Sequence, residues 1–280
     1  MARAPGDLAV YATPGPLTML PAEQAEMLRR SGLDPIDLCR AAQRVLVSPA
    51  DAAGAGLSEQ RMAEQHLRPA SALLERAWHL DAEAGLLGSR PIDRRVVGTC
   101  RHYAVLATAF LRAAGVPARA RCGFATYFTS PEKVDHWIVE YWSTEHDRWI
   151  GIDPEYVDRP TPGAARTADL APGEFLTAGA AWMLIRSGRA DASDFGVHGT
   201  EHWGPAEVRG NVLRDVASLE HKLEMLPWDS WGPMEESYDG TTGDDFDVLV
   251  DRLASAAEDP DRRGLRRLFE PLAVPASLLR

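Results

Sequence analysis

The chain has 280 residues, of which 45% are hydrophobic and 25% are charged, and its formal net charge is −11. This composition is typical of a folded globular protein and argues against a disordered or membrane-embedded chain. The acidic balance disfavours nucleic acid as a partner, because it would repel a phosphate backbone.

The first ninety residues are predicted to be mainly helical. Residues 1–20 are rich in proline and glycine and are expected to be irregular. Over residues 21–79, apolar residues recur at helical spacing and predict short amphipathic helices, with breaks between residues 32 and 35. The last of these helices is expected over residues 70–80, with Leu73, Leu74, Ala77 and Trp78 on its apolar side.

A turn-rich connection over residues 85–95 leads into the most informative stretch, residues 96–156, which is expected to hold one helix followed by three strands. Further helices are predicted at residues 171–186, 206–225 and 246–257, the second of them ending at Pro227. The pattern predicts an α+β fold in one compact domain. Its expected parts are a helical N-terminal region (1–90), a core (91–160) and a mostly helical C-terminal region (161–280).

The three cysteines Cys39, Cys100 and Cys122 are too few and too widely spaced for a disulfide framework. The N-terminal segment lacks the apolar run of a signal peptide, and no stretch is long enough to cross a membrane. These observations favour the cytoplasm. They also leave the thiols available for chemistry.

Cys100 is predicted to stand at the first position of a helix. Thr99 suits the N-cap, and Gly115 followed by Pro117 suits the end of the helix. The N-terminal end of a helix dipole favours a thiolate over a thiol, and its free N–H groups could hold an oxyanion. A buried structural role is the alternative for a lone cysteine.

Two strands follow that are rich in aromatic and β-branched residues, DHWIVEYW and DRWIGID. With a four-residue loop that pairs Trp142 with Asp147, His136 would lie directly opposite Asp153 on one face of the sheet. Asp135 would point to the other face, because neighbouring strand residues alternate. The order of Cys, His and Asp therefore predicts a catalytic triad with Cys100 as nucleophile, His136 as base and Asp153 as orienting carboxylate.

The stretch resembles the transglutaminase-like superfamily, whose members share a papain-like core. The matching segments are GTCRHYAVLATAFLRAAGVPARARCGF, DHWIVEYW and RWIGIDP. The resemblance implies a nucleophile helix packed on an antiparallel sheet. It also implies the same three roles for Cys100, His136 and Asp153. Members often carry an aromatic residue two positions after the histidine, whereas here Trp137 follows it directly and Ile138 is two positions away.

The predicted activity is thiol-dependent acyl chemistry on a small-molecule or peptide amide, through a thioester on Cys100. Hydrolysis and transfer to a small amine both remain open, and no cofactor or metal is expected. A non-catalytic binding module with the same fold is the alternative. Candidate substrate-binding residues are Trp137, Gly98, Thr99 and Tyr103.

Other motifs are weaker. HGTEH (198–202) has the spacing of a zinc-binding H-x-x-E-H helix, but the surrounding glycines and Pro205 indicate a loop, so a zinc peptidase using His198 and His202 is a minor alternative. Trp228 and Trp231 are expected to pack the C-terminal helices. The strand arginines, Arg119 and Arg121, are expected to be solvated. A buried strand position is expected for Cys122, and His102 is expected on a different side of its helix from Cys100.

Overall fold

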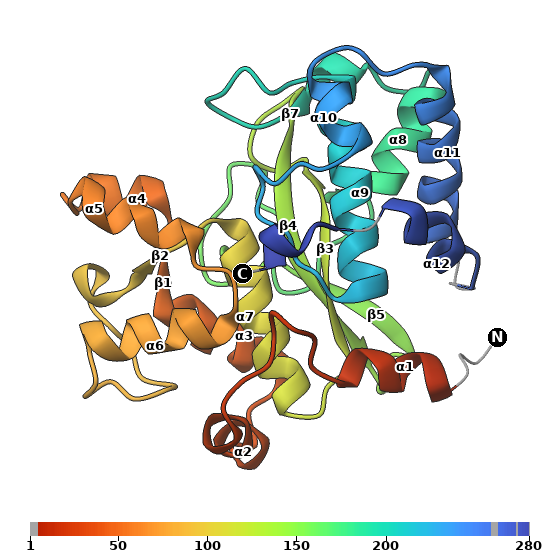
Figure 1. Cartoon of the computed structure of the whole chain (residues 1–280). Helices are drawn as coiled ribbons and strands as arrows, with labels where there is room; N and C mark the ends of the chain where they lie inside the picture. Colours follow the sequence, from red (N-terminus) through yellow and green to blue (C-terminus); the bar gives the residue numbers. More distant parts are fainter. Residues whose placement is uncertain (1–4, 259–262, 273, 280) are drawn as a thin grey trace. The chain divides into compact units, whose positions relative to one another are not determined.

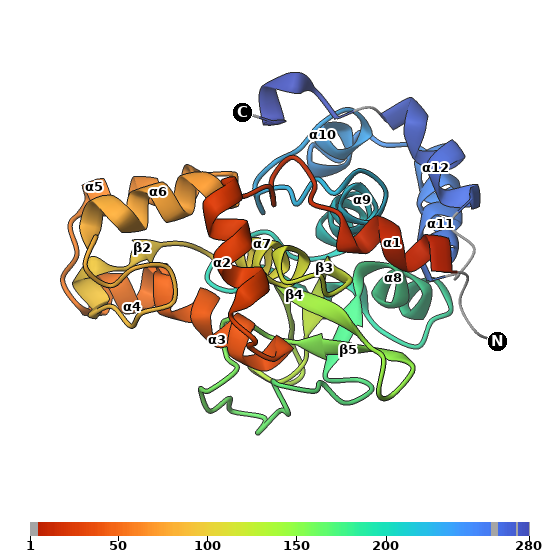
Figure 2. The same ribbon diagram turned by 90° about the horizontal axis from the view of Figure 1, so that it is seen from below.

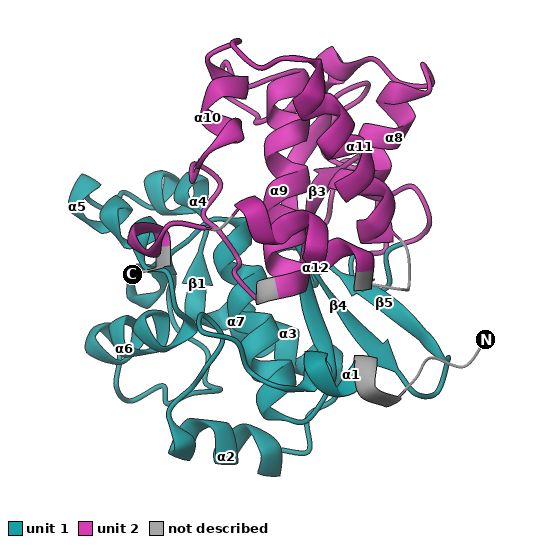
Figure 3. Cartoon of the chain, turned by 45° about the vertical axis from the view of Figure 1, so that its right-hand side comes forward, with its two compact units in different colours: residues 1–120, 138–159, 167–170 teal, residues 121–137, 160–166, 171–280 magenta. Residues whose placement is uncertain are grey.

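The computed structural model describes residues 5–258, 263–272 and 274–279, and the chain forms two compact units (Figure 3). Unit 1 comprises the described residues up to 120, with 138–159 and 167–170. Unit 2 comprises 121–137, 160–166 and the described residues from 171 onward. The units are interleaved in sequence, because the strands β3 (Ala118–Ala125) and β4 (Lys133–Ser143) each contribute residues to both.

The fold is α+β, as predicted. The main sheet has the strand order β5-β4-β3-β6, and β7 pairs with β4 (Figure 1). The β4–β5 and β3–β6 pairs are antiparallel, whereas β4 and β7 are parallel. The additional strands are β5 (Arg148–Ile152), β6 (Phe175–Thr177) and β7 (Phe195–Gly196).

Unit 1 is built around the helix α7 (Cys100–Ala113), whose side chains from residue 101 to 112 are all buried. Its neighbours include α3 (Pro35–Val45), α2 (Ala22–Arg30) and α6 (Ala70–Leu80), as Figure 2 shows from below. The sequence predicted a helix with one apolar stripe, and the structure shows a helix that is buried on all sides. The shorter helices are α1 (Pro5–Ala12), α4 (Pro49–Gly54) and α5 (Glu59–Met62).

Several sequence expectations for unit 1 are confirmed, and others are wrong. The chain between α2 and α3 breaks at Gly32, where φ is +67°. Residues 5–12 form a helix instead of irregular chain, which places Tyr11 in the interior at 1% exposure. Two short strands, β1 (Leu46–Val47) and β2 (Val96–Val97), pair in parallel and hold the chain just before α7. Neither strand was expected.

Unit 2 carries the C-terminal helices: α8 (Ala178–Arg186), α9 (Pro205–His221), α10 (Pro233–Tyr238), α11 (Asp244–Glu258) and α12 (Arg263–Phe269). The α9 helix ends at His221, because Lys222 turns the chain with φ +54°, so Pro227 is not its stop signal. The short strand β6 precedes α8, so the helix starts later than the predicted residue 171.

The predicted hairpin register is wrong by two residues. Trp142 pairs with Trp149, not with Asp147, and the last observed pair is Val139 with Ile152. The loop has four residues as expected, but it begins one position later, since Asp147 takes a left-handed φ of +50° and belongs to the turn. Continuing the ladder would put Ile138 opposite Asp153. Because a shift of two keeps side chains on the same face, His136 keeps its predicted face.

Both strand arginines are buried instead of solvated. Arg119 is 8% exposed and pairs with Glu140 at 2.6 Å. Arg121 is 3% exposed and donates to both carboxylate oxygens of Asp215, at 3.0 and 2.9 Å. These partners lie far from the arginines in sequence, so the alternation of a strand could not reveal them.

Candidate active site

The three predicted catalytic residues are distributed over both units. Cys100 and Asp153 belong to unit 1, and His136 belongs to unit 2. The structure describes the surroundings of each residue within its own unit. The catalytic constellation itself therefore stays a prediction.

Cys100 occupies the first position of α7, as the sequence predicts, and is partly exposed. Thr99 is the N-cap. The first N–H groups of an α-helix have no intrahelical acceptor, and the dipole is positive at this end. A thiol at this position has the electrostatic environment that favours its anion.

The start of α7 is fixed by His102, a residue to which the sequence assigned no role. Its Nδ1 accepts from the backbone N–H of Thr99 at 3.0 Å, and its Nε2 lies 3.0 Å from the carbonyl of Leu67. This pattern assigns the ring proton to Nε2. Burial, aided by the neighbouring Arg101 charge, lowers the pKa of His102 to about 3, so the ring is neutral. The Thr-x-x-His spacing is that of a capping box, a signal already present in the sequence.

Gly98 also serves this arrangement. A Cβ at this position would lie 2.8 Å from the Cβ of His102 and 3.0 Å from its Cγ, which is too close. Its N–H donates to the carbonyl of Val47 at 3.0 Å. The absent side chain therefore makes room for His102, and the predicted contact of Gly98 with substrate stays a prediction.

The other two thiols are in the interior. Cys39 and Cys122 are both 0% exposed. Burial raises the pKa of the Cys39 thiol, and the nearby Asp153 charge raises it further. A buried neutral thiol is a poor nucleophile. Cys100 is therefore the cysteine of this chain best placed to react.

Asp153 follows β5 and is 0% exposed. Its Oδ1 accepts from the backbone N–H groups of Glu155, at 3.0 Å, and Tyr156, at 3.2 Å. Its own N–H donates to the carbonyl of Thr167 at 2.8 Å. The carboxylate is thus held in one orientation by a turn, in the manner common for aspartate before proline.

His136 is 4% exposed and lies against two aromatic rings of its own unit. The ring centroids of Phe128 and Tyr127 are 5.1 Å and 6.3 Å from that of His136, in edge contacts. Such packing restricts the imidazole to few orientations. Both rings belong to the segment between β3 and β4, which carries no motif that would have predicted this role.

Asp135 turns away from His136 into a buried polar chain, in keeping with strand alternation. It accepts from Asn211 Nδ2 at 2.6 Å, and Asn211 Oδ1 accepts from Arg214 at 2.9 Å. Burial, followed by the charge of Glu207, raises the pKa of Asp135 to about 6. Arg214 completes the chain with donations to Glu207, Tyr238 and the carbonyl of Asp229.

The proposed substrate contacts have mixed surroundings. Thr99 is partly exposed, whereas Gly98 is buried. Tyr103 is 2% exposed and belongs to the main core cluster of unit 1. Trp137 is fully buried, and its indole N–H has no hydrogen-bond partner among the described residues. Their contact with a substrate stays a prediction.

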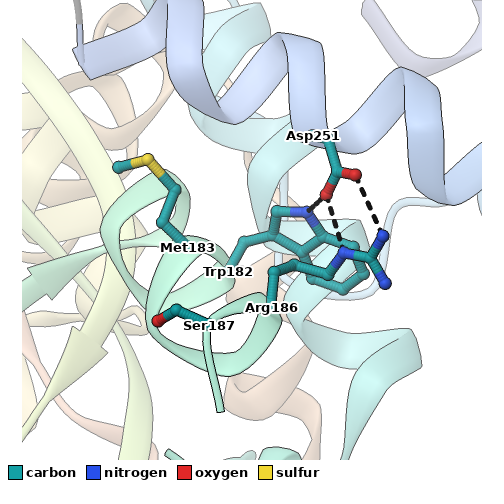
Figure 4. Close-up of a pocket in the computed structure, with 5 residues that line it drawn as sticks. All are labelled: Trp182, Met183, Arg186, Ser187 and Asp251. Atoms are coloured by element: carbon teal, nitrogen blue, oxygen red, sulfur yellow. Dashed lines mark hydrogen bonds and ion pairs between the residues drawn. The ribbon is translucent and has the colours of Figure 1, made fainter. Parts of the chain in front are cut away.

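The HGTEH segment is a loop, as its glycines indicated, and His198 and His202 are exposed. Among the described residues, no group of three or more His, Cys, Asp or Glu side chains could hold a metal ion. A separate hollow of about 420 Å³ lies along α8 and α11, where Asp251 accepts from both Trp182 and Arg186 (Figure 4). No helix in the described part of the chain is both long and apolar enough to span a bilayer.

Comparison with known proteins finds one family model that is similar to the central segment. Residues 86–154 match the family model of the Transglutaminase-like superfamily. A solved structure, "a Putative Cysteine Protease from Cytophaga hutchinsonii", is similar with 15% identity and a TM-score of 0.36, over 63% of this chain and 49% of that one. The chain thus spans about half the length of this neighbour. No curated protein sequence matches the chain.

Proposed function

Because residues 86–154 match the transglutaminase-like superfamily, we propose that the protein is a cysteine-dependent enzyme acting on acyl groups. Cys100 is the nucleophile, His136 the general base and Asp153 the residue that orients the imidazole. The substrate is a small-molecule or peptide amide, and the proposed compartment is the cytoplasm. The observation that carries the proposal is the position of Cys100 at the start of α7, partly exposed, while Cys39 and Cys122 are sealed in the interior.

The chemistry proceeds in two stages. His136 takes the thiol proton of Cys100, and Sγ attacks the carbonyl carbon of the amide. The N–H groups at the start of α7 stabilise the developing oxyanion. His136 then returns the proton to the leaving amine, and a thioester remains on Cys100. Water or a second amine next attacks the thioester, with His136 again accepting the proton, and the thiol is regenerated.

Asp153 supports the charged form of His136 in this scheme. A carboxylate hydrogen-bonded to an imidazole fixes its tautomer and stabilises the imidazolium. The two backbone N–H groups that bind Oδ1 of Asp153 hold the side chain rigid. A rigid carboxylate loses little entropy when it orients the ring.

Alkylation with iodoacetamide near neutral pH tests the nucleophile and its base. Cys100 should be modified at least about tenfold faster than Cys39 or Cys122, because only a thiolate within reach of solvent reacts quickly. His136→Ala should remove most of this advantage. His146→Ala, in the exposed hairpin loop, is the matched control and should react like the unchanged protein. Equal, slow labelling of all three cysteines would instead favour a non-catalytic binding module.

A second experiment separates hydrolysis from transfer. Incubation with 4-nitrophenyl acetate should release a burst of 4-nitrophenolate and leave one acetyl group on Cys100, detectable by mass spectrometry. Added methylamine should speed deacylation and form N-methylacetamide if the enzyme is a transferase. A turnover rate that does not respond to the amine would identify a hydrolase. An acetyl group that never appears on Cys100 would contradict the thioester mechanism.

A further inference from the structure

Unit 1 contains a cavity of about 310 Å³, large enough for a small molecule. It is formed by residues of α2, of α6 and of the connection after α6. The lining residues are Glu23, Gln24, Met27, Leu74, Trp78, Gly85, Leu86 and Arg90. Cys100 is not among them, so this is a site separate from the proposed nucleophile.

Arg90 is a buried cation that forms no ion pair with a carboxylate of the described residues. The side chain belongs to a residue that is 3% exposed, and its Nε–H has no hydrogen-bond partner among the described residues. Nη2 donates to the carbonyl of Gly85, and Nη1 only reaches that of Gly88 at 3.5 Å. Burial lowers the pKa of Arg90, with partial compensation from the charge of Asp81. Buried charges are normally paired, because an unpaired one loses its hydration without compensation.

The loop before Arg90 is shaped to hold this guanidinium. A Cβ at Gly88 would lie 2.0 Å from the carbonyl oxygen of Ala84, so no other residue fits there without moving the loop. The backbone of Arg90 is held in turn, since its carbonyl accepts from Arg95 Nε at 2.8 Å. The unpaired cation is therefore a feature of an ordered loop.

Gln24 supplies a second unsatisfied polar group in the same cavity. Its Oε1 is buried and has no hydrogen-bond partner among the described residues. A buried amide oxygen that accepts no hydrogen bond costs free energy, because it has lost its hydrogen bonds to water. Both unsatisfied groups belong to residues that line the cavity. Neither atom is open to solvent, so a ligand reaches them only when the two side chains rotate toward the hollow.

The remaining wall is apolar and unusually exposed. Trp78 is 58% exposed and Met27 is 47% exposed, whereas Leu74 is buried at 5%. The sequence predicted Trp78 and Leu74 on one side of their helix, and both side chains line this cavity. Large apolar side chains that flank a hollow with unsatisfied polar groups are typical of a ligand site. Glu23 also lines the hollow, but it is exposed, so water screens its charge.

We propose that this cavity binds an N-acylated apolar amino acid, either free or as the last residue of a peptide. The carboxylate of the ligand accepts from Arg90, its amide N–H donates to Gln24, and its apolar side chain covers Trp78 and Met27. Arginine suits a carboxylate because its planar fork can donate two parallel hydrogen bonds. One ligand thereby neutralises the buried charge and satisfies both polar groups.

Matched ligands test each contact by isothermal titration calorimetry on a Cys100→Ser variant, which keeps thioester chemistry out of the measurement. N-acetyl-L-leucine should bind saturably. N-acetyl-L-leucinamide, which lacks the carboxylate, should bind at least about tenfold more weakly, and 4-methylvalerate, which lacks the amide N–H, about two- to tenfold more weakly. Tighter binding of the peptide Gly-Gly-Ala-Leu than of N-acetyl-L-leucine would identify a peptide terminus as the ligand, and equal binding a free acylated amino acid.

Matched variants complete the test. Arg90→Met should weaken N-acetyl-L-leucine at least about tenfold, Gln24→Met about two- to tenfold and Trp78→Ala about three- to tenfold. Arg189→Met, an exposed arginine of unit 2, removes the same charge and should change binding by less than about twofold. The site would be refuted if none of the ligands bound at about 10 mM, a concentration well above typical ligand-site affinities. Equal affinity for the acid and its amide, or for the unchanged protein and Arg90→Met, would also refute it. Failure here would leave the proposed triad untouched, because the alkylation experiment tests it separately.

Discussion

Two buried arginines of this protein have opposite surroundings. In unit 2, all five N–H donors of Arg214 are bonded to protein acceptors: Glu207, Asn211, Tyr238 and the carbonyl of Asp229. In unit 1, Arg90 is equally buried, but its Nε–H has no partner among the described residues. A cation whose donors are all used holds the fold together, whereas Arg90, with an unused donor and a place in the lining of a cavity, is the proposed contact for a carboxylate. Burial alone does not distinguish the two.

The largest expected effect on stability comes from removing Arg214, whose N–H donors are all bonded. Arg214→Met should lower the free energy of unfolding by about 3–5 kcal/mol, because it leaves buried carboxylates without compensation. Urea denaturation at pH 7 measures this change. A loss below about 1 kcal/mol would show that the Arg214 chain is not structural.

His102 is also a buried titratable side chain, but unlike Arg214 it is neutral in the folded protein. Its pKa is about 3 in the folded protein and about 6.5 in an unfolded chain, so the unfolded state binds the proton first as the pH falls. The stabilising contribution is complete above pH 6.5 and is lost progressively below it, by about 3 kcal/mol at pH 4.

The His102→Asn variant keeps a short polar side chain at this helix position and cannot titrate. Its unfolding free energy, measured by urea denaturation between pH 7 and 4, should fall less than that of the unchanged protein. Parallel curves for the two proteins would contradict a buried neutral His102.

Asp135 is linked to Arg214 through Asn211. Its effect on the pH dependence of stability should be opposite to that of His102. Its pKa is raised to about 6, so the folded state holds the proton more tightly than the unfolded state does. The unfolding free energy contributed by this group is therefore highest below about pH 4 and falls as the pH rises through about 6. Asp135→Asn should remove this fall, and the difference between the two denaturation curves against pH isolates it. A difference that does not change with pH would contradict the raised pKa.

The smallest expected change in stability is that of replacing Arg90, the buried arginine with an unused donor. Arg90→Met should change the unfolding free energy by less than about 1 kcal/mol, or increase it, because replacing an unpaired buried charge with an apolar side chain removes a desolvation cost. Urea denaturation without ligand measures this. A loss as large as that of Arg214→Met would show that Arg90 is a structural cation and not a ligand site.

Local chemistry made much of the backbone predictable. The position of Cys100 at the start of a helix follows from Thr99 and from the helical spacing of apolar residues after it, and the structure has this start. The left-handed Gly115 and the loop at HGTEH are confirmed for the same reason, since glycine sets the backbone within a few residues. The hairpin was foreseen, but its register was not, because the turn conformation of Asp147 decides which residues pair.

The α+β class, the helix that begins at Cys100, the strand with His136 and the strand that ends just before Asp153 could all be predicted from local sequence patterns. The burial of polar side chains and the identity of their partners became visible only in the folded chain. Arg121 meets Asp215, and Asp135 meets Asn211, across 94 and 76 positions of the chain. Arg90 forms no ion pair in the part of the chain that the structure describes, although the charge of Asp81 is near enough to affect its pKa. The physical reason is that helix caps and strand alternation act over a few residues, whereas the pairing of buried charges depends on segments that only folding brings together.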